Sequence, residues 1–363
     1  MRLPLAGGFR NRIYRTYKEL ETREHRLLYL FFELTRRCNL ACLHCGSDCE
    51  RAPSMREMTL ETWISIMDYV KARWDPFIVI TGGEPLVRKD LGEITAALKE
   101  RGLRWGMVTN GFALDAARFS MLEANGLSSM TISLDGDRDR HTYIRRHPLS
   151  FDRALEALSL LGASGVEHKD TVSCVYPANL DRLESIASLL IERGITSWRL
   201  FRIFPRGGAA RHPELILDFA QSTKLIQWIA DNRKGFRQRG LDLSFSCEGY
   251  LPFTLDRKVR SEPFFCRAGI NIASILSDGT VTGCNNNGPA FHQGNISDAD
   301  LEALWEKGFG AYRDRSWMHC GACAECAHWK DCLGGSIHLR DPCRPDTDFC
   351  YLKDVCTAVS KPE

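Results

Sequence analysis

The feature that most constrains this chain is a set of three closely spaced cysteines in the segment TRRCNLACLHC. Cys38, Cys42 and Cys45 have C-x3-C-x2-C spacing and directly follow an apolar stretch. Three thiolates on one short loop can ligate three irons of a cubane iron–sulfur cluster, which leaves the fourth iron open to a small ligand. Zinc is the alternative, but a structural zinc site needs four ligands and would have to recruit Cys49 or His44. The spacing therefore favours an iron–sulfur cluster.

The remaining cysteines also point to metal rather than to disulfides. The chain has 363 residues and 15 cysteines, and its N-terminal segment contains no apolar stretch of signal-peptide length. An odd number of cysteines in a long chain without an export signal is typical of metal ligation in a reducing compartment. A cytoplasmic location is therefore expected. Cys174 and Cys247 stand apart from the clustered cysteines, and we expect both to be buried apolar residues.

Composition narrows the class of protein. Hydrophobic residues make up 44% of the chain, charged residues make up 26%, and the formal net charge is +2. These values are typical of a soluble globular protein and give no sign of a nucleic-acid partner or an anionic membrane surface. The most apolar run, residues 27–32, is too short to span a bilayer.

Apolar strand patterns alternate with helical patterns through the first two thirds of the chain. This alternation predicts an α/β fold with a parallel sheet, as an open or partial (β/α)6 barrel whose active site lies at the carboxyl ends of the strands. The predicted strands are 28–35, 77–81, 105–109, 129–134, 171–175 and 198–204. The predicted helices between them are 60–73, 91–101, 113–125, 151–162 and 180–193.

Two flanking regions differ from this pattern. Residues 9–25 are charged and predict a helical surface arm, whose basic stretch from Arg10 to Lys18 we expect to be a solvated face. From about residue 245 helical periodicity weakens and Cys, Gly, Asn and Asp become frequent, which predicts a loop-rich, cysteine-rich second domain. The expected division is an arm at 1–27, a core at 28–245 and a C-terminal domain at 246–363.

Further motifs fall at the ends of successive predicted strands. TGGEP (81–85) ends the second strand, VTNG (108–111) the third and SLDG (133–136) the fourth, and Arg145 follows in YIRRHPLSF. Because these motifs follow the cysteine triad in this order, residues 28–245 resemble the radical S-adenosylmethionine (SAM) superfamily. The resemblance implies that Cys38, Cys42 and Cys45 hold a [4Fe–4S] cluster, which reductively cleaves SAM to a 5′-deoxyadenosyl radical.

The resemblance also implies a SAM-binding site. The backbone of the GGEP motif and Glu84 would receive the SAM amino group. Arg145 would pair with the SAM carboxylate, which requires a bidentate contact of the kind that arginine makes. The residues implied for SAM binding are Gly82, Gly83, Glu84, Pro85, Thr109, Asn110, Ser133, Asp135 and Arg145.

The C-terminal cysteines resemble the SPASM domain, an auxiliary-cluster module of radical SAM enzymes. Cys266, Gly279 and Cys284 match the opening of its pattern, but Ser336 stands where a fourth cysteine of the later C-x2-C-x5-C-x3-C element is expected. The resemblance implies a first auxiliary cluster on Cys266 and Cys284, completed by Cys320, Cys343, Ser336, an open iron or a substrate ligand. It implies a second cluster on Cys323, Cys326, Cys332 and Cys350, with Cys350 chosen over Cys343 and Cys356. The alternative is a zinc ribbon on Cys320, Cys323, Cys326 and Cys332.

Similarity to SPASM enzymes implies a reaction on a peptide or protein, such as crosslink or thioether formation. Two rivals are sulfatase maturation and modification of a small molecule such as a tetrapyrrole. Sulfatase-maturating enzymes carry an aspartate after the second SPASM cysteine, whereas this chain has Asn285, whose amide cannot take a proton. The expected partners are a peptide or protein substrate and an electron donor such as flavodoxin or ferredoxin. The segment before the first strand is shorter than a recognition domain of roughly 80 residues, so a separate leader-recognition protein is a further candidate.

Overall fold

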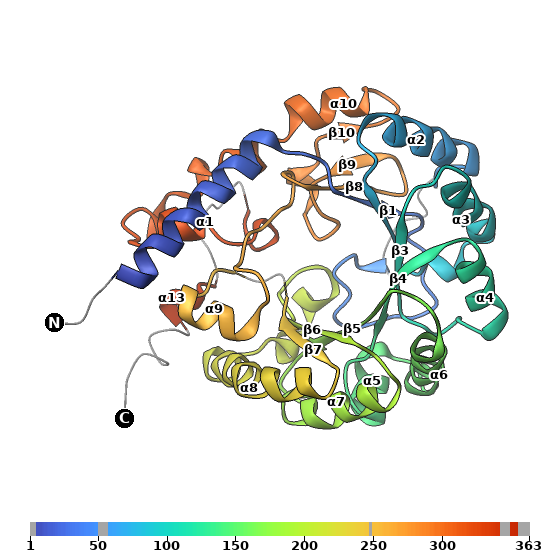
Figure 1. Ribbon diagram of the computed structural model, residues 1–363, viewed down its shortest axis with the longest axis horizontal. Coiled ribbons are helices and arrows are strands. Elements are labelled where there is room, and N and C mark those ends of the chain that lie inside the picture. Colours follow the sequence, from blue (N-terminus) through green and yellow to red (C-terminus); the bar gives the residue numbers. More distant parts are fainter. Residues whose placement is uncertain (1–4, 50–56, 247–248, 342–348, 355–363) are drawn as a thin grey trace.

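The computed structural model describes residues 5–49, 57–246, 249–341 and 349–354 (Figure 1). Its centre is one ten-stranded sheet with the strand order β10-β9-β8-β1-β2-β3-β4-β5-β6-β7. From β8 through β1 to β7, neighbouring strands in this order pair in parallel. Strand β9 pairs antiparallel with both β8 and β10. The strands are β1 (Tyr29–Glu33), β2 (Phe77–Thr81), β3 (Trp105–Thr109), β4 (Leu127–Ser133), β5 (His168–Val175), β6 (Ser197–Arg202), β7 (Asp242–Phe245), β8 (Ile272–Ile275), β9 (Thr280–Thr282) and β10 (Gly294–Asn295).

Helices follow the outside of the curved sheet (Figure 1). Those of the barrel are α2 (Leu60–Arg73), α3 (Leu91–Glu100), α4 (Ala116–Ala124), α5 (Arg138–Arg145), α6 (Ser150–Ala163), α7 (Leu183–Glu192) and α8 (Phe219–Gln238). The others are α1 (Leu5–Glu24), α9 (Phe253–Val259), α10 (Leu301–Ala303), α11 (Gly310–Arg313), α12 (Trp329–Cys332) and α13 (Tyr351–Asp354). The sheet does not close, so the predicted partial barrel is confirmed, with all six predicted strands present.

Alternation along each strand separates two faces of the sheet. In β2, Ile78 and Ile80 are fully buried, whereas Phe77, Val79 and Thr81 are half-buried. The buried set belongs to the main hydrophobic core, and the half-buried set lies on the concave inner face. The inner face is therefore the less enclosed one, and the motifs at the strand ends border it.

The cysteine-rich region joins the sheet of the barrel. Strand β8 pairs in parallel with β1, with Leu30 opposite Ala273 and Phe32 opposite Ile275. The expected division at residue 245 falls directly after β7, yet the same sheet continues on its other side through β8 and β9. The first strand of the barrel is thus held between β2 and a strand from the C-terminal region.

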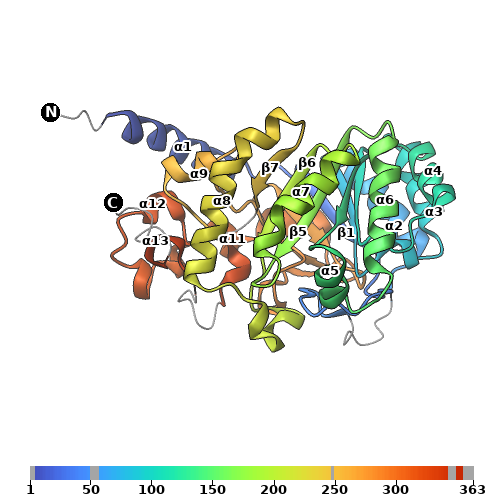
Figure 2. The same cartoon turned by 90° about the horizontal axis from the view of Figure 1, so that it is seen from below.

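The N-terminal helix is not the solvated arm that its charge pattern predicted. Arg15 of α1 makes two hydrogen bonds to the carboxylate of Asp331, at 2.6 and 2.8 Å, and Lys18 is only 3% exposed. In Figure 2, α1 lies at the same end of the molecule as α9 and α12. The expectation of a solvated basic face was therefore wrong for these two residues, because they contact the C-terminal region. Within the described residues, every helix is too short or too polar to cross a membrane.

Candidate active site

The loop that carries the cysteine triad leaves β1 and is clamped by the glycines that follow β2. The backbone N–H of Gly83 donates to the Thr35 carbonyl at 2.7 Å, and that of Glu84 donates to the Arg37 carbonyl at 2.9 Å. A Cβ atom at Gly82 would lie 2.5 Å from the Thr35 carbonyl oxygen, and one at Gly83 would lie 2.4 Å from that of Arg37. Glycine is needed at both positions because two backbones approach closely here.

Glu84 connects the ends of β2 and β3. Its Oε1 accepts hydrogen bonds from the Leu86 N–H at 3.1 Å and the Thr109 hydroxyl at 2.7 Å, and its Oε2 accepts from the Asn110 N–H at 2.7 Å. Burial raises the pKa of this carboxyl group, and the hydrogen bonds oppose that shift. Both carboxylate oxygens thus already accept hydrogen bonds from the protein, and a SAM amino group would have to share them. Pro85 begins the short turn η2 (Pro85–Val87) that follows.

Asn110 brings the end of β3 to the cysteine triad. Its side-chain amide donates to Asn39 Oδ1 at 2.9 Å and lies 3.8 Å from the Cys38 sulfur. The predicted SAM residue Asn110 is therefore adjacent to the first cysteine, and Thr109 is joined to Glu84, as expected for motifs at the ends of successive strands.

Asp135 and Arg145 form a buried ion pair beside Cys42. Arg145 Nε donates to Asp135 Oδ2 at 2.6 Å, and its Nη1 lies 3.8 Å from the Cys42 sulfur. Burial alone would raise the pKa of Asp135, but the charge of Arg145, with smaller effects of His44 and His141, lowers it to about 2. The pair fixes one guanidinium next to the triad, where it could meet a carboxylate.

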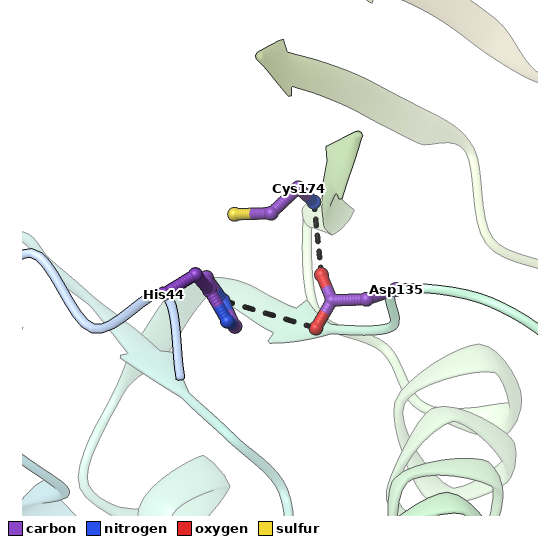
Figure 3. A group of neighbouring side chains, drawn as sticks. All are labelled: His44, Asp135 and Cys174. Atoms are coloured by element: carbon purple, nitrogen blue, oxygen red, sulfur yellow. Dashed lines mark hydrogen bonds and ion pairs between the residues drawn. The ribbon is translucent and has the colours of Figure 1, made fainter. Parts of the chain in front are cut away.

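His44 and Cys174 complete the surroundings of Asp135 (Figure 3). The Cys174 N–H donates to Asp135 Oδ1 at 2.8 Å, His44 Nε2 lies 4.0 Å from Oδ2, and possible ligand atoms of all three lie within 4.8 Å of one another. Such a group could bind a metal ion, but Arg145 already supplies the positive charge at Asp135. Cys174 is half-buried at the end of β5, and the predicted SAM residue Ser133 is half-buried at the end of β4.

The segment after β6 covers the triad loop, and sequence reasoning missed it. The Gly208 N–H donates to the Cys45 carbonyl at 2.8 Å, and a Cβ atom at Gly207 would lie 2.3 Å from the Gly46 carbonyl oxygen. Arg211, at the end of the turn η4 (Gly207–Arg211), forms two hydrogen bonds with the Asp48 carboxylate, at 2.6 and 2.8 Å. The paired glycines directly after the sixth strand were the available signal.

The thiols of the triad suit a cluster better than a single ion. Within the described residues, the only three Cys, His, Asp or Glu side chains whose ligand atoms lie within 4.8 Å of one another are His44, Asp135 and Cys174, so the triad sulfurs are spaced more widely. Burial raises the pKa of Cys38 to about 12 and also raises that of Cys42, whereas a hydrogen bond from the Cys49 thiol lowers the pKa of Cys45. A cavity of about 510 Å³ borders the loop, lined by Arg37, Cys38, Asn39, Leu40, Ala41, Cys49, Arg146 and His147. Wider spacing fits a cubane, whose thiolates bind different irons.

The C-terminal thiols gather in two places. Burial raises the pKa of Cys284 to about 11, and the neighbouring Cys266 thiol adds to the shift. Burial likewise raises the pKa of Cys332 to about 12, with further contributions from Cys350 and Cys323. Cys266 therefore lies near Cys284, and Cys323 and Cys350 lie near Cys332.

Tight turns and one buried hydroxyl group position the other predicted ligands of the C-terminal region. The Cys323 N–H donates to the Cys320 carbonyl and the Cys326 N–H donates to the Cys323 carbonyl, so consecutive tight turns present these cysteines. Ser336 is buried, and its hydroxyl accepts a hydrogen bond from the Gly249 N–H at 3.2 Å. Cys247, Cys343 and Cys356 lie outside the described residues.

Comparison with known proteins identifies the class. Residues 32–190 match the family model of the radical SAM superfamily, and residues 266–327 match that of the SPASM iron–sulfur cluster-binding domain. The chain belongs to the radical SAM superfamily and carries a SPASM domain. Its cofactors are therefore SAM and iron–sulfur clusters, and it is an enzyme.

Individual relatives cover most of the chain. The mycofactocin maturase MftC of Mycolicibacterium smegmatis is 31% identical over 321 residues, which cover 86% of this chain and 78% of that protein. A PqqA peptide cyclase of Ruegeria pomeroyi is 30% identical, covering 77% and 75%. An AdoMet-dependent heme synthase of Nitratidesulfovibrio vulgaris is 25% identical, covering 84% and 85%.

Solved structures share the fold. SuiB of Streptococcus suis bound to SAM has a TM-score of 0.69 at 19% identity, covering 88% of this chain and 76% of that one. The enzyme anSMEcpe with bound AdoMet has a TM-score of 0.70 at 20% identity, covering 92% and 95%.

Proposed function

We propose that this enzyme modifies a genetically encoded peptide. It cleaves SAM reductively and uses the 5′-deoxyadenosyl radical to take a hydrogen atom from the peptide. The resulting peptide radical then loses a proton and passes one electron to an auxiliary cluster. Crosslink or thioether formation is such a net two-electron oxidation.

The observation that carries this proposal is the contact between the two cysteine regions. The loop after Cys284 reaches the triad loop, and a Cβ atom at Gly46 would lie 3.2 Å from Asn286 Oδ1. Strand β8 also lies directly beside β1, from which the triad loop leaves. An auxiliary cluster on Cys266 and Cys284 would therefore lie close enough to the radical site to accept an electron from it.

Relatives from both substrate classes match this chain, and those named for peptide modification share the higher percentage identity with it. Those whose names denote a maturase or a peptide cyclase are 30–31% identical to this chain, whereas the heme synthase is 25% identical. Sulfatase maturation is disfavoured because the amide of Asn285 cannot act as a base. In the described structure, the Oδ1 atom of Asn285 is buried and has no hydrogen-bond partner.

The residue roles follow from the site. Cys38, Cys42 and Cys45 would hold the radical SAM cluster, and Arg145, positioned by Asp135, would receive the SAM carboxylate. The backbone of Gly82 and Gly83 would face the SAM amino group. Flavodoxin or ferredoxin would supply the electron, and a separate protein would present the peptide leader.

The experiment compares substrate classes under anaerobic conditions. Reconstituted full-length protein receives SAM and dithionite with a precursor peptide encoded beside its gene, an iron-loaded tetrapyrrole, or a cysteine-containing sulfatase peptide. We expect the precursor peptide alone to stimulate 5′-deoxyadenosine release and to lose two hydrogens by mass spectrometry. Cys38→Ala/Cys42→Ala/Cys45→Ala is the control and should release none. Turnover of the tetrapyrrole without turnover of the peptide would overturn the proposal.

A further inference from the structure

Two buried cations lie beside the thiols of the second C-terminal cysteine group. Lys18 comes from the N-terminal helix α1, and Arg340 follows the turn η10 (Ile337–Leu339). Lys18 is 3% exposed and Arg340 is 5% exposed. Burying a cation is costly unless opposite charge compensates it, so negative charge on the neighbouring thiolates would stabilise both side chains.

The carboxylates near the ammonium group of Lys18 are already paired with arginines, Asp331 with Arg15 and Asp256 with Arg260. Its Nζ donates to the Asp331 carbonyl at 2.5 Å and lies 4.9 Å from the ring centre of Tyr14, 5.7 Å from that of Phe265 and 6.0 Å from that of Tyr250. Both oxygens of the Asp331 carboxylate accept hydrogen bonds from Arg15 instead. Cys332 follows Asp331 directly in the chain, and its thiolate would add negative charge near this ammonium group.

Arg340 contacts a second thiol of the same group. Its Nη2 lies 3.5 Å from the Cys323 sulfur, and its Nε and Nη2 both donate to the Gly334 carbonyl, at 2.9 and 2.7 Å. These hydrogen bonds fix the plane of the guanidinium against the cysteine loop.

We propose that Lys18 and Arg340 are the counter-charges of the auxiliary cluster on Cys323, Cys326, Cys332 and Cys350, and that they raise its reduction potential. A cubane held by four thiolates is negatively charged, and reduction adds to that charge. Nearby buried cations therefore stabilise the reduced form more than the oxidised form. The cluster becomes a better acceptor for the electron that the cluster on Cys266 and Cys284 takes from the substrate radical.

Helix α1 thereby takes part in the electron path through Lys18. The role of the two cations rests on the proposed ligand set, and the experiment distinguishes a wrong ligand set from a wrong role. The measurement is an EPR-monitored redox titration of reconstituted full-length protein with Cys38, Cys42 and Cys45 replaced by Ala, so that the radical SAM cluster gives no signal. The auxiliary signal is assigned by its loss in Cys332→Ala. If no signal depends on Cys332, the ligand set is wrong and the inference falls with it.

Lys18→Gln and Arg340→Gln keep a hydrogen-bond donor and remove the charge. We expect each to lower the midpoint potential of the assigned cluster, and the double variant to lower it further. Arg23→Gln removes an exposed charge from the same helix and should leave the potential unchanged. An intact cluster with an unshifted potential in both variants would overturn the inference.

A variant that loses the cluster is also informative, because charge can be restored. If Lys18→Gln lowers the iron content, Lys18→Arg should recover both the iron and the potential. Failure of Lys18→Arg to recover them would assign Lys18 a packing role and contradict the inference.

Discussion

At the scale of single residues, Asp135 determines where Arg145 can act. Its carboxylate has no exposed surface and keeps its charge because the Arg145 guanidinium lies 2.6 Å away. Asp135→Asn leaves Arg145 buried without a full counter-charge, which should cost about 3 kcal/mol of unfolding free energy. We expect SAM to bind at least about tenfold more weakly, since Arg145 is no longer fixed. Denaturant unfolding and calorimetric SAM titration of the reconstituted protein measure both effects.

The pKa of Asp135 gives this prediction a pH signature. The pKa falls from 3.8 to about 2 on folding, so the pair contributes stability above pH 4 that is lost as pH falls toward 2. Asp135→Asn should therefore show a flatter stability profile in this range. Asp152→Asn, which breaks the exposed pair with Arg138, is the control and should change stability far less than Asp135→Asn does. Equal effects of the two variants would contradict the argument.

Cys45 should be the most reactive thiol of the triad in metal-free protein. The Cys49 thiol donates a hydrogen bond to it and lowers its pKa below the ordinary value of 9.0, whereas burial raises the pKa values of Cys38 and Cys42. Since the thiolate is the nucleophile, iodoacetamide should modify Cys45 first, at a rate that levels off at lower pH than the rates of the other two. Cys49→Ala should move the Cys45 profile to higher pH. Peptide mass spectrometry over a pH series measures this, and an unchanged profile would count against the hydrogen bond.

At the scale of elements, close backbone contacts around the triad loop carry the site. A Cβ atom at Gly83 meets the Arg37 carbonyl oxygen at 2.4 Å, so Gly83→Ala should displace the loop and reduce the iron bound at the triad. Gly235 lies in α8, where an added Cβ atom would meet no other part of the described chain within 4 Å beyond its own helix backbone. Gly235→Ala should therefore retain all iron and stabilise the helix by up to about 1 kcal/mol. Iron analysis and thermal unfolding of the two variants test this, and a full iron content in Gly83→Ala would show that the loop can shift without loss.

Local pattern predicted some elements well and others not at all. Residues 77–81 and 105–109 are strands as predicted, because short apolar runs between turn residues determine them. Strand β8 was not foreseen, because its four residues carry no distinctive pattern and its partner β1 is far away in the chain. The motif residues at the strand ends were predictable from their order. The place of Lys18 was not predictable, because its partner Asp331 is 313 residues away in the chain. The positive charge of Lys18 indicated a solvated face instead.

At the scale of the whole molecule, the shared sheet couples the barrel to the C-terminal region. Strand β1 pairs with β2 on one side and with β8 on the other, so neither half keeps a complete sheet without the other. We therefore expect a single cooperative thermal unfolding transition rather than one for each region. Two separate calorimetric transitions in the wild-type protein would contradict this coupling.

Strand β8 is the place to test that coupling directly. Ser274 lies within β8, opposite Phe31 of β1 and Thr282 of β9. Ser274→Pro removes a backbone donor from the sheet and should destabilise the protein by about 3 kcal/mol or more. Because β1 loses its neighbour, hydrogen exchange should accelerate in residues 29–33 of the barrel as well as in residues 280–282. Faster exchange confined to the C-terminal strands would show that β1 is stable without β8, and that the two regions are energetically separate.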